Sequence, residues 1–184
     1  MSVIYLDNNA TTRPDPAVVE AMGPYFNEYY GNASSVHRFG QLARKAIDDA
    51  RASVAELIGA RESELIFTGS GTESVNAAIR GLLPARTPRR QIVTSAVEHS
   101  ATGELCRQLA GEGFEICTID VDDKGRLNLQ ALATAIGDQT ALVTLLWANN
   151  ETGVIFPIPA IGEMCKKAGT PLHVDGTQAV GKIG

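Results

Sequence analysis

The sequence predicts an α/β domain with a mostly parallel sheet and helices on both of its faces. Short apolar runs alternate along the chain with longer stretches in which apolar residues recur at helical spacing. The apolar runs lack the polar alternation of half-exposed strands, which is typical of strands buried on both faces. Candidate ligand-binding residues are therefore sought beyond the carboxyl ends of the strands, where open α/β sheets bind their ligands.

The elements follow one another in a regular order. The predicted strands are Val3–Leu6, Leu65–Thr68, Gln91–Ser95, Glu115–Ile119, Ala141–Leu146 and Leu172–Val174. The predicted helices are Gln41–Ile58, Thr72–Leu83, Ala101–Glu112, Leu129–Ile136 and Ile158–Ala168. Gly59 and Gly169 follow the first and the last of these helices as expected C-caps. The opening region is rich in loops, and we expect Gly23-Pro24 to break its helix.

Composition excludes several classes of protein. The chain has 184 residues, of which 44% are apolar and 20% charged, which is ordinary for a soluble globular domain. Its net charge of −5 comes with no basic stripe, so we expect no nucleic-acid partner. No apolar run is long enough to span a membrane, and the N-terminus does not resemble a signal peptide. These features predict a cytoplasmic protein without membrane contact.

The three cysteines agree with a reducing compartment. Cys106, Cys117 and Cys165 are odd in number and lack short metal-type spacing. Nothing near them in the sequence indicates an activated thiolate, so we do not expect any of them to be a nucleophile.

The stretch LIFTGSGTESVN, residues 65–76, predicts an anion site. A glycine turn after an apolar run allows close backbone approach, and the following helix start attracts negative charge. Ser70 and Thr72 add hydroxyl donors. No lysine follows the second glycine, as a Walker loop would require, and the third glycine of a dinucleotide fingerprint is missing. A simple glycine turn with a Ser/Thr cap explains the stretch equally well.

Polar residues also follow three later strands. His99 could stack on a flat ring or move protons, although a lone histidine is more often structural. Asn149 and Asn150 could bind a phenolic oxygen or a carboxylate, or could simply build a turn. Asp175 could pair with a protonated ring nitrogen, with Gln178 close to the same ring. Together with the anion site, these residues predict a pyridoxal phosphate pocket.

The chain resembles the NifS-like cysteine desulfurases, which are class V, fold-type-I pyridoxal phosphate enzymes. The matching stretches are YLDNNATT, GNASSVHRFG, FTGSGTESVN, EHSA, WANNETG and HVDGTQAVGK, in the order of the family and across nearly the whole chain. The resemblance implies that Gly71 and Thr72 bind the cofactor phosphate, and that His99 stacks on the ring and helps to move protons. It also implies that Asp175 pairs with the ring nitrogen and that Gln178 bonds the phenolic oxygen.

The resemblance further implies the reaction. L-cysteine would be converted to L-alanine, and the sulfur would leave on an enzyme cysteine as a persulfide for iron–sulfur cluster or thio-cofactor assembly. Asn150 would lie near the phenolic oxygen and the substrate carboxylate, and residues 7–11 would line the substrate entrance. The implied partners are a sulfur-acceptor or scaffold protein and a second copy of the chain in a homodimer.

Three parts of the family pattern are missing from the sequence. These are the histidine-lysine motif whose lysine forms the Schiff base, the persulfide cysteine, and the small C-terminal domain with its substrate arginine; Lys182 matches a different family lysine. The resemblance therefore implies an N-terminal strand and entrance loop over residues 1–15, and then an incomplete, truncated large domain over residues 16–184. By itself the chain would be inactive and would need the missing half.

Several alternatives remain open at this point. A selenocysteine lyase or another class V enzyme would share these motifs, because the distinguishing cysteine loop is absent from the sequence. A catalytically incomplete fragment could also bind the cofactor without the lysine. A nucleotide-binding α/β domain would use the glycine turn, but its ribose-binding acid is not evident.

Overall fold

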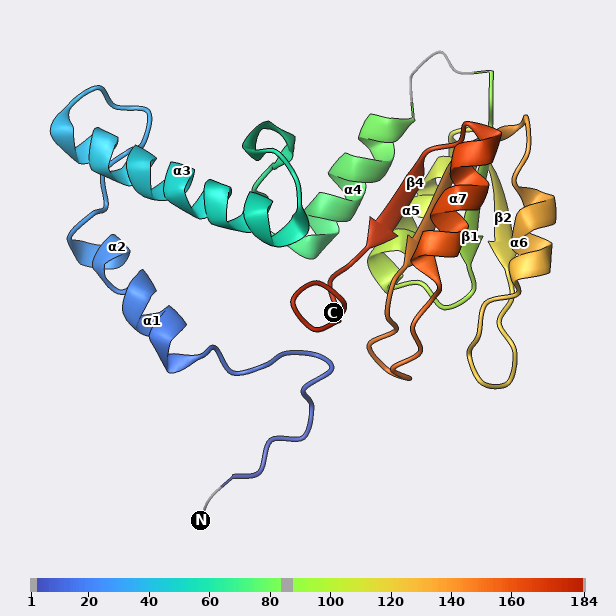
Figure 1. Cartoon of the computed structure of the whole chain (residues 1–184), viewed down its shortest axis with the longest axis horizontal. Helices are drawn as coiled ribbons and strands as arrows, with labels where there is room; N and C mark the ends of the chain where they lie inside the picture. Colours follow the sequence, from blue (N-terminus) through green and yellow to red (C-terminus); the bar gives the residue numbers. More distant parts are fainter. Residues whose placement is uncertain (1–2, 84–87, 184) are drawn as a thin grey trace. The chain divides into compact units, whose positions relative to one another are not determined.

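The computed structural model describes residues 3–83 and 88–183. The backbone forms two compact units, residues 1–67 and residues 68–184, which we call the N-terminal unit and the C-terminal unit (Figure 1). The domain boundary expected after residue 15 remains a prediction.

The N-terminal unit is helical. Its elements are α1 (Pro16–Met22), α2 (Pro24–Asn27), α3 (Arg38–Ile58) and the 3₁₀ turn η1 (Glu62–Glu64). The expected break at Gly23-Pro24 is confirmed, because α1 ends and α2 begins there. The long helix α3 ends at Gly59, whose φ of 65° lies in the left-handed region that glycine adopts without strain.

Two predicted strands are wrong. Neither Val3–Leu6 nor Leu65–Thr68 is a strand in the described part of the chain. An apolar run becomes a strand only when another strand accepts its backbone hydrogen bonds, and sequence periodicity does not show whether one is present. The carbonyl of Leu65 instead accepts a hydrogen bond of 2.6 Å from the Arg51 guanidinium, which also lies over the Phe67 ring.

The C-terminal unit alternates helices and strands. In chain order its elements are α4 (Gly71–Leu82), β1 (Gln91–Ser95), α5 (Ser100–Gly111), β2 (Glu115–Ile119), α6 (Leu129–Ala135), β3 (Thr140–Leu146), α7 (Ile158–Ala168) and β4 (Leu172–Asp175). Each predicted element of this unit is confirmed to within one residue at either end. The order of the elements is therefore readable from the sequence.

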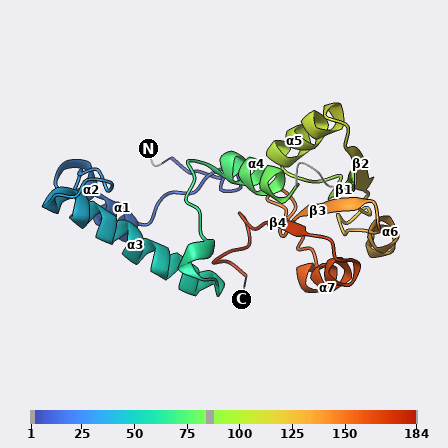
Figure 2. The same ribbon diagram turned by 90° about the horizontal axis from the view of Figure 1, so that it is seen from above.

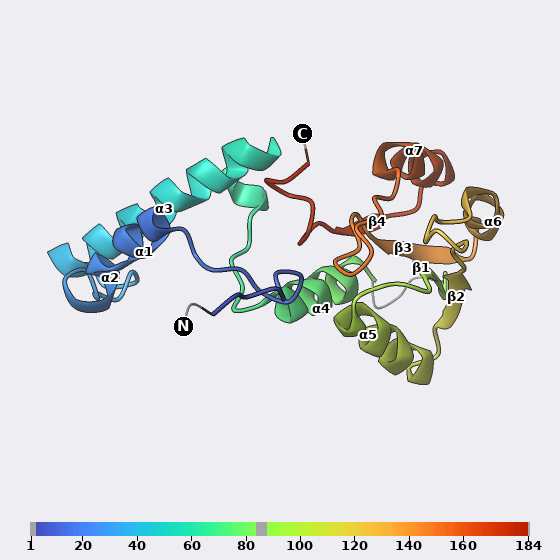
Figure 3. The same cartoon turned by 90° about the horizontal axis from the view of Figure 1, so that it is seen from below.

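The strands form a parallel sheet in the order β2-β1-β3-β4, which confirms the predicted fold class. Figures 2 and 3 show α4 and α5 on one side of this sheet and α6 and α7 on the other. Each side has its own apolar core. Ile92 and Leu142 pack toward Leu105 and its neighbours on α4 and α5, while Val93 and Val143 belong to the cluster of α6 and α7.

This topology brings the strand ends together. Parallel strands present their carboxyl ends at one edge, and the strand order reverses between β1 and β3, which is where such sheets bind ligands. Asp175 pairs in register with Leu146, so the ends of β3 and β4 are level. Because α4 leads into β1 and α5 leaves it, the first turns of both helices lie at this same edge.

Within the described residues, no helix is long and apolar enough to cross a bilayer. The same residues hold no cluster of His, Cys, Asp and Glu side chains arranged to bind a metal ion.

Candidate active site at the carboxyl edge of the sheet

The first turn of α4 has the features of an anion site. Ser70 caps the helix by accepting a hydrogen bond from the Glu73 amide at 3.2 Å, and the Glu73 carboxylate accepts one from the Gly69 amide at 2.7 Å. The amides of Gly71 and Thr72 belong to the first turn and so have no acceptor within the helix. A side chain at Gly71 would meet nothing within 4 Å, so the approach to these amides is open. The Ser70 cap therefore leaves the amides of Gly71 and Thr72 without a partner inside the helix.

His99 lies at the first turn of α5. It is the N-cap residue, and its Nδ1 accepts a hydrogen bond from the Ala101 amide at 3.2 Å. A neutral ring that accepts at Nδ1 carries its proton on Nε2, and the ring is exposed.

A cavity of about 560 Å³ lies between α4 and α5 and runs along α5 as far as Gln108. Thr72 and Asn76 of α4 line one side, and Ser100 and Ala101 of α5 line the other. The predicted phosphate-binding threonine therefore shares a cavity with the turn that carries His99.

The two asparagines after β3 have different surroundings. Asn149 builds the turn, because its Oδ1 accepts hydrogen bonds from the amides of Glu151 and Thr152. Its Nδ2 donates to the Val97 carbonyl at 3.2 Å and so ties the loop after β3 to the loop after β1. Asn150 is half-buried, and its side chain makes no hydrogen bond with the residues the structure describes. The amide that is free to bind a ligand is therefore that of Asn150.

Asp175 ends β4 as a half-buried carboxylate. Its Oδ1 accepts a hydrogen bond from the Thr177 amide at 3.0 Å, and its carbonyl accepts one from the Trp147 amide at 2.9 Å. The described part of the chain supplies no ion-pair partner for this carboxylate. Gln178 lies in the following turn, where its Oε1 accepts a hydrogen bond from Lys182 Nζ at 2.6 Å.

Glu98 is a site residue to which the sequence assigned no role. It precedes His99, and its carboxyl group is held between the ends of β1 and β3 by Ser95 and the Leu146 amide. Burial raises the pKa of Glu98 to about 7, against the lowering effect of these hydrogen bonds. The sequence does contain a signal for Glu98, because it is an acidic residue just after a buried strand, and the same feature identified Asp175.

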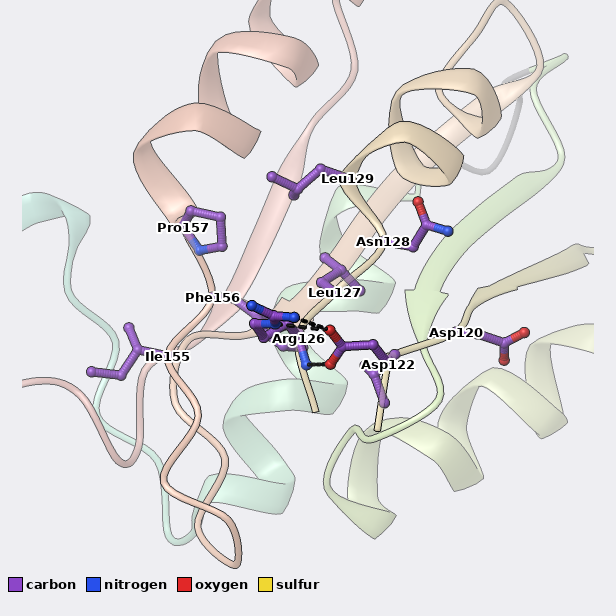
Figure 4. A pocket seen from close by; sticks show the side chains of 10 residues that line it. Asp120, Asp122, Arg126, Leu127, Asn128, Leu129, Ile155, Phe156 and Pro157 are labelled. Carbon is purple, nitrogen blue, oxygen red and sulfur yellow. Dashed lines mark hydrogen bonds and ion pairs between the residues drawn. The ribbon is translucent and has the colours of Figure 1, made fainter. Parts of the chain in front are cut away.

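A second cavity, of about 730 Å³, contains none of the predicted site residues (Figure 4). It lies between the 120–129 segment and residues 155–157. Asp122 forms an ion pair with Arg126 there and also accepts hydrogen bonds from two backbone amides. The hydrogen bond from the Arg126 side chain is the main reason why the pKa of Asp122 is lowered. The charges of Asp122 and Arg126 therefore satisfy each other within this cavity.

The cysteines lie in protected environments. Cys106 and Cys165 are buried and Cys117 is half-buried. Burial raises the pKa of all three thiols, which disfavours the reactive thiolate form.

Comparison with known proteins identifies the family. The pattern of the aminotransferase class-V family matches residues 4–184. A cysteine desulfurase of Nostoc sp. is 52% identical over 183 residues, which cover 100% of this chain and 46% of that protein. The cysteine desulfurase NifS of Azotobacter vinelandii is 47% identical over 184 residues, with the same two coverages. The chain thus spans about half the length of these curated relatives.

Solved structures give the same result. A NifS-like protein superposes with a TM-score of 0.94 at 37% identity, covering 98% of this chain and 50% of that one. A structure of SspA in complex with cysteine superposes with a TM-score of 0.91 at 33% identity, covering 95% of this chain and 51% of that one. From its matched residues and its fold, the chain belongs to the aminotransferase class-V family.

Proposed function

We propose that this chain is the N-terminal part of a pyridoxal phosphate-dependent cysteine desulfurase and supplies most of its cofactor site. The observation that carries the proposal is the half-buried carboxylate of Asp175, which has no ion-pair partner among the described residues and lies level with the end of β3 at the edge where the strand order reverses. A carboxylate in such a position is stabilised by a ligand cation, and the pyridinium nitrogen of the cofactor is one.

The residues present fit this cofactor at both of its charged ends. The phosphate would be bound by the first-turn amides of α4 at Gly71 and Thr72, where the open space at Gly71 allows a close approach. The positively charged ring nitrogen of the cofactor would lie against the Asp175 carboxylate. The exposed His99 ring follows β1 at the same edge of the sheet and would stack on the cofactor ring.

Bound pyridoxal phosphate supplies an electron sink for the substrate's reacting carbon. Asp175 would keep the ring nitrogen protonated, which strengthens that effect. The Nε2 proton of His99 would be available for proton transfer, because Nδ1 is engaged by the Ala101 amide. Asn150 would donate its free amide to the phenolic oxygen and the substrate carboxylate, and Gln178 would bond the same phenolic oxygen.

The proposed substrate is L-cysteine, with L-alanine as product and a persulfide on a cysteine outside this chain as the carrier of sulfur. The names of the curated relatives and the bound cysteine of the SspA structure support this choice. A cytoplasmic homodimer that passes sulfur to an acceptor or scaffold protein, for iron–sulfur cluster assembly, completes the proposal.

The test compares two carboxylates of the protein as its gene encodes it. We expect Asp175→Ala to weaken pyridoxal phosphate binding at least about tenfold, because a partly buried charge pair is lost. Formation of alanine from cysteine should fall with it. Glu163→Ala is the matched control, since Glu163 is exposed on α7. Absorbance titration measures the affinity; equal effects of the two substitutions would contradict the assignment of Asp175.

A further inference from the structure

Glu98 joins the two strands between which the sheet order reverses. Its Oε1 accepts a hydrogen bond from Ser95 Oγ at the end of β1, at 2.5 Å, and another from the Leu146 amide at the end of β3, at 3.1 Å. Glu98 and Leu146 are 48 residues apart in the sequence but are in direct contact in the fold. The carboxyl group therefore fixes the spacing of the strand ends, and with it the backbone that leads into His99.

The other oxygen of this carboxyl group is buried without a partner. Glu98 Oε2, Thr94 Oγ1 and Thr102 Oγ1 are buried side-chain oxygens that make no hydrogen bond within the described residues. Thr94 belongs to the end of β1, Glu98 to the loop that follows it, and Thr102 to the start of α5. An ionised carboxylate that leaves a buried oxygen unpaired is unfavourable, whereas a neutral carboxyl group carries less charge into the same place.

The charged neighbour of Glu98 opposes its ionisation, whereas its hydrogen-bond partners favour it. Asp175 at the end of β4 acts on it as a like charge, and the Cys106 thiol of α5 is itself disfavoured as a thiolate by Glu98. The β1 and β3 groups that touch it, Ser95 Oγ and the Leu146 amide, are neutral. The pKa of Glu98 is raised to about 7; burial is the largest cause, and the charge of Asp175 is a smaller contribution in the same direction.

We propose that Glu98 is a positioning residue that keeps its carboxyl proton through the acidic range in which free glutamate ionises, tying the ends of β1 and β3 together while the permanent negative charge beside the cofactor ring is left to Asp175. This inference rests on the proposed function for its link to the cofactor. Two ionised carboxylates at this edge would repel each other, because the charge of Asp175 disfavours the ionised form of Glu98. A protonated Glu98 still offers Oε1 as a hydrogen-bond acceptor without that repulsion.

The direct test measures the protonation of Glu98 in the cofactor-free, full-length protein. With glutamate carboxyl carbons labelled with ¹³C, the signal that disappears in both Glu98→Gln and Glu98→Asp belongs to Glu98. We expect its titration midpoint near pH 7, well above the value of about 4.3 for free glutamate. A midpoint at or below the value for free glutamate would overturn the proposal.

A second measurement uses folding. The folded protein keeps a proton that the unfolded chain releases above pH 4.3, so stability should fall as pH rises from there to about 7. The unfolding equilibrium constant of the wild type should therefore rise by up to about tenfold per pH unit, relative to Glu98→Gln, across this window. The exposed control Glu163→Gln should keep the slope of the wild type. An unchanged slope in Glu98→Gln would count against the proposal.

A third measurement connects Glu98 to the cofactor. Glu98→Gln preserves a neutral acceptor, so pyridoxal phosphate affinity should stay within about threefold of the wild type, whereas Glu98→Ala should lose affinity. A loss of tenfold or more in a folded Glu98→Gln variant would mean that the ionised form is needed. If the wild type binds no pyridoxal phosphate, the proposed function fails, while the titration in cofactor-free protein still decides the protonation state of Glu98.

Discussion

The two units of the chain bury their apolar residues to very different extents. In the C-terminal unit, every residue of β3 is buried, and both faces of the sheet are covered by helices. In the N-terminal unit, the 21-residue helix α3 buries only Gly40, Ala43 and Ala55 within the described structure. Amphipathic spacing therefore identifies a helix without identifying the surface against which its apolar side packs.

The difference is clearest in the large side chains. The large apolar residues of α3 that remain exposed are Phe39, Leu42, Ile47, Val54, Leu57 and Ile58. What defines α3 locally is the His37 N-cap, the Gly59 C-cap and exposed ion pairs one turn apart, such as that of Lys45 with Asp49. These local devices are worth little each, whereas the sheet is stabilised by burial.

The largest expected effect contrasts a buried leucine with an exposed one. Leu142 on β3 is 0% exposed and Leu57 on α3 is 66% exposed. We expect Leu142→Ala to lower the free energy of unfolding by about 3 kcal/mol, and Leu57→Ala to change it by less than about 0.5 kcal/mol. Urea unfolding followed by circular dichroism measures both. A large loss from Leu57→Ala would show that α3 has a covering surface in solution, which would remove the contrast between the units.

An intermediate effect is expected at the helix ends. Gly59 closes α3 with φ 65° and Gly169 closes α7 with φ 59°, so the two units contain matched left-handed caps. Alanine at either position should cost about 1 kcal/mol because of backbone strain. The same unfolding measurement compares them. If Gly59→Ala has no effect while Gly169→Ala has the full effect, the N-terminal unit does not unfold together with the rest.

The smallest expected effect concerns exposed charges. Lys45 and Asp49 form a fully solvated ion pair on α3, and the pair raises the pKa of Lys45 chiefly through its hydrogen bond. Lys45→Ala should leave the unfolding midpoint unchanged in 0.5 M salt and shift it slightly at low ionic strength. A shift that persists in high salt would show that this side chain supports α3 through packing.

The sequence predicted the C-terminal unit well because burial there leaves a strong local signal. The bounds of β1 and β2 follow from apolar runs between turn residues, and those of α7 from Pro157 and Gly169. The strand order was not predictable, since periodicity does not say on which side of β1 a later strand will pair. The two wrong strands fail for the same reason, because pairing depends on a neighbour that local sequence does not reveal.

The site shows the same limit. The sequence placed His99, Asn150 and Asp175 at strand ends, and the parallel sheet brings those ends to one edge. Their roles remain predictions. Glu98 received no role because its partners are the Ser95 hydroxyl and a backbone amide on a strand 48 residues away, which no spacing rule reports. Burial of an acidic side chain by residues distant in the sequence can be recognised only when the fold is known.

The strand order also has a consequence for synthesis on the ribosome. β1 pairs first with β2, while its other edge has to wait for β3, since Gln91 meets Thr140 across a separation of 49 residues. Until then the nascent central strand exposes a row of unpaired backbone groups that could recruit neighbouring polypeptides. Slowing elongation between these two strands should therefore favour aggregation of the emerging chain, and the arrival of β3 should end that vulnerable interval.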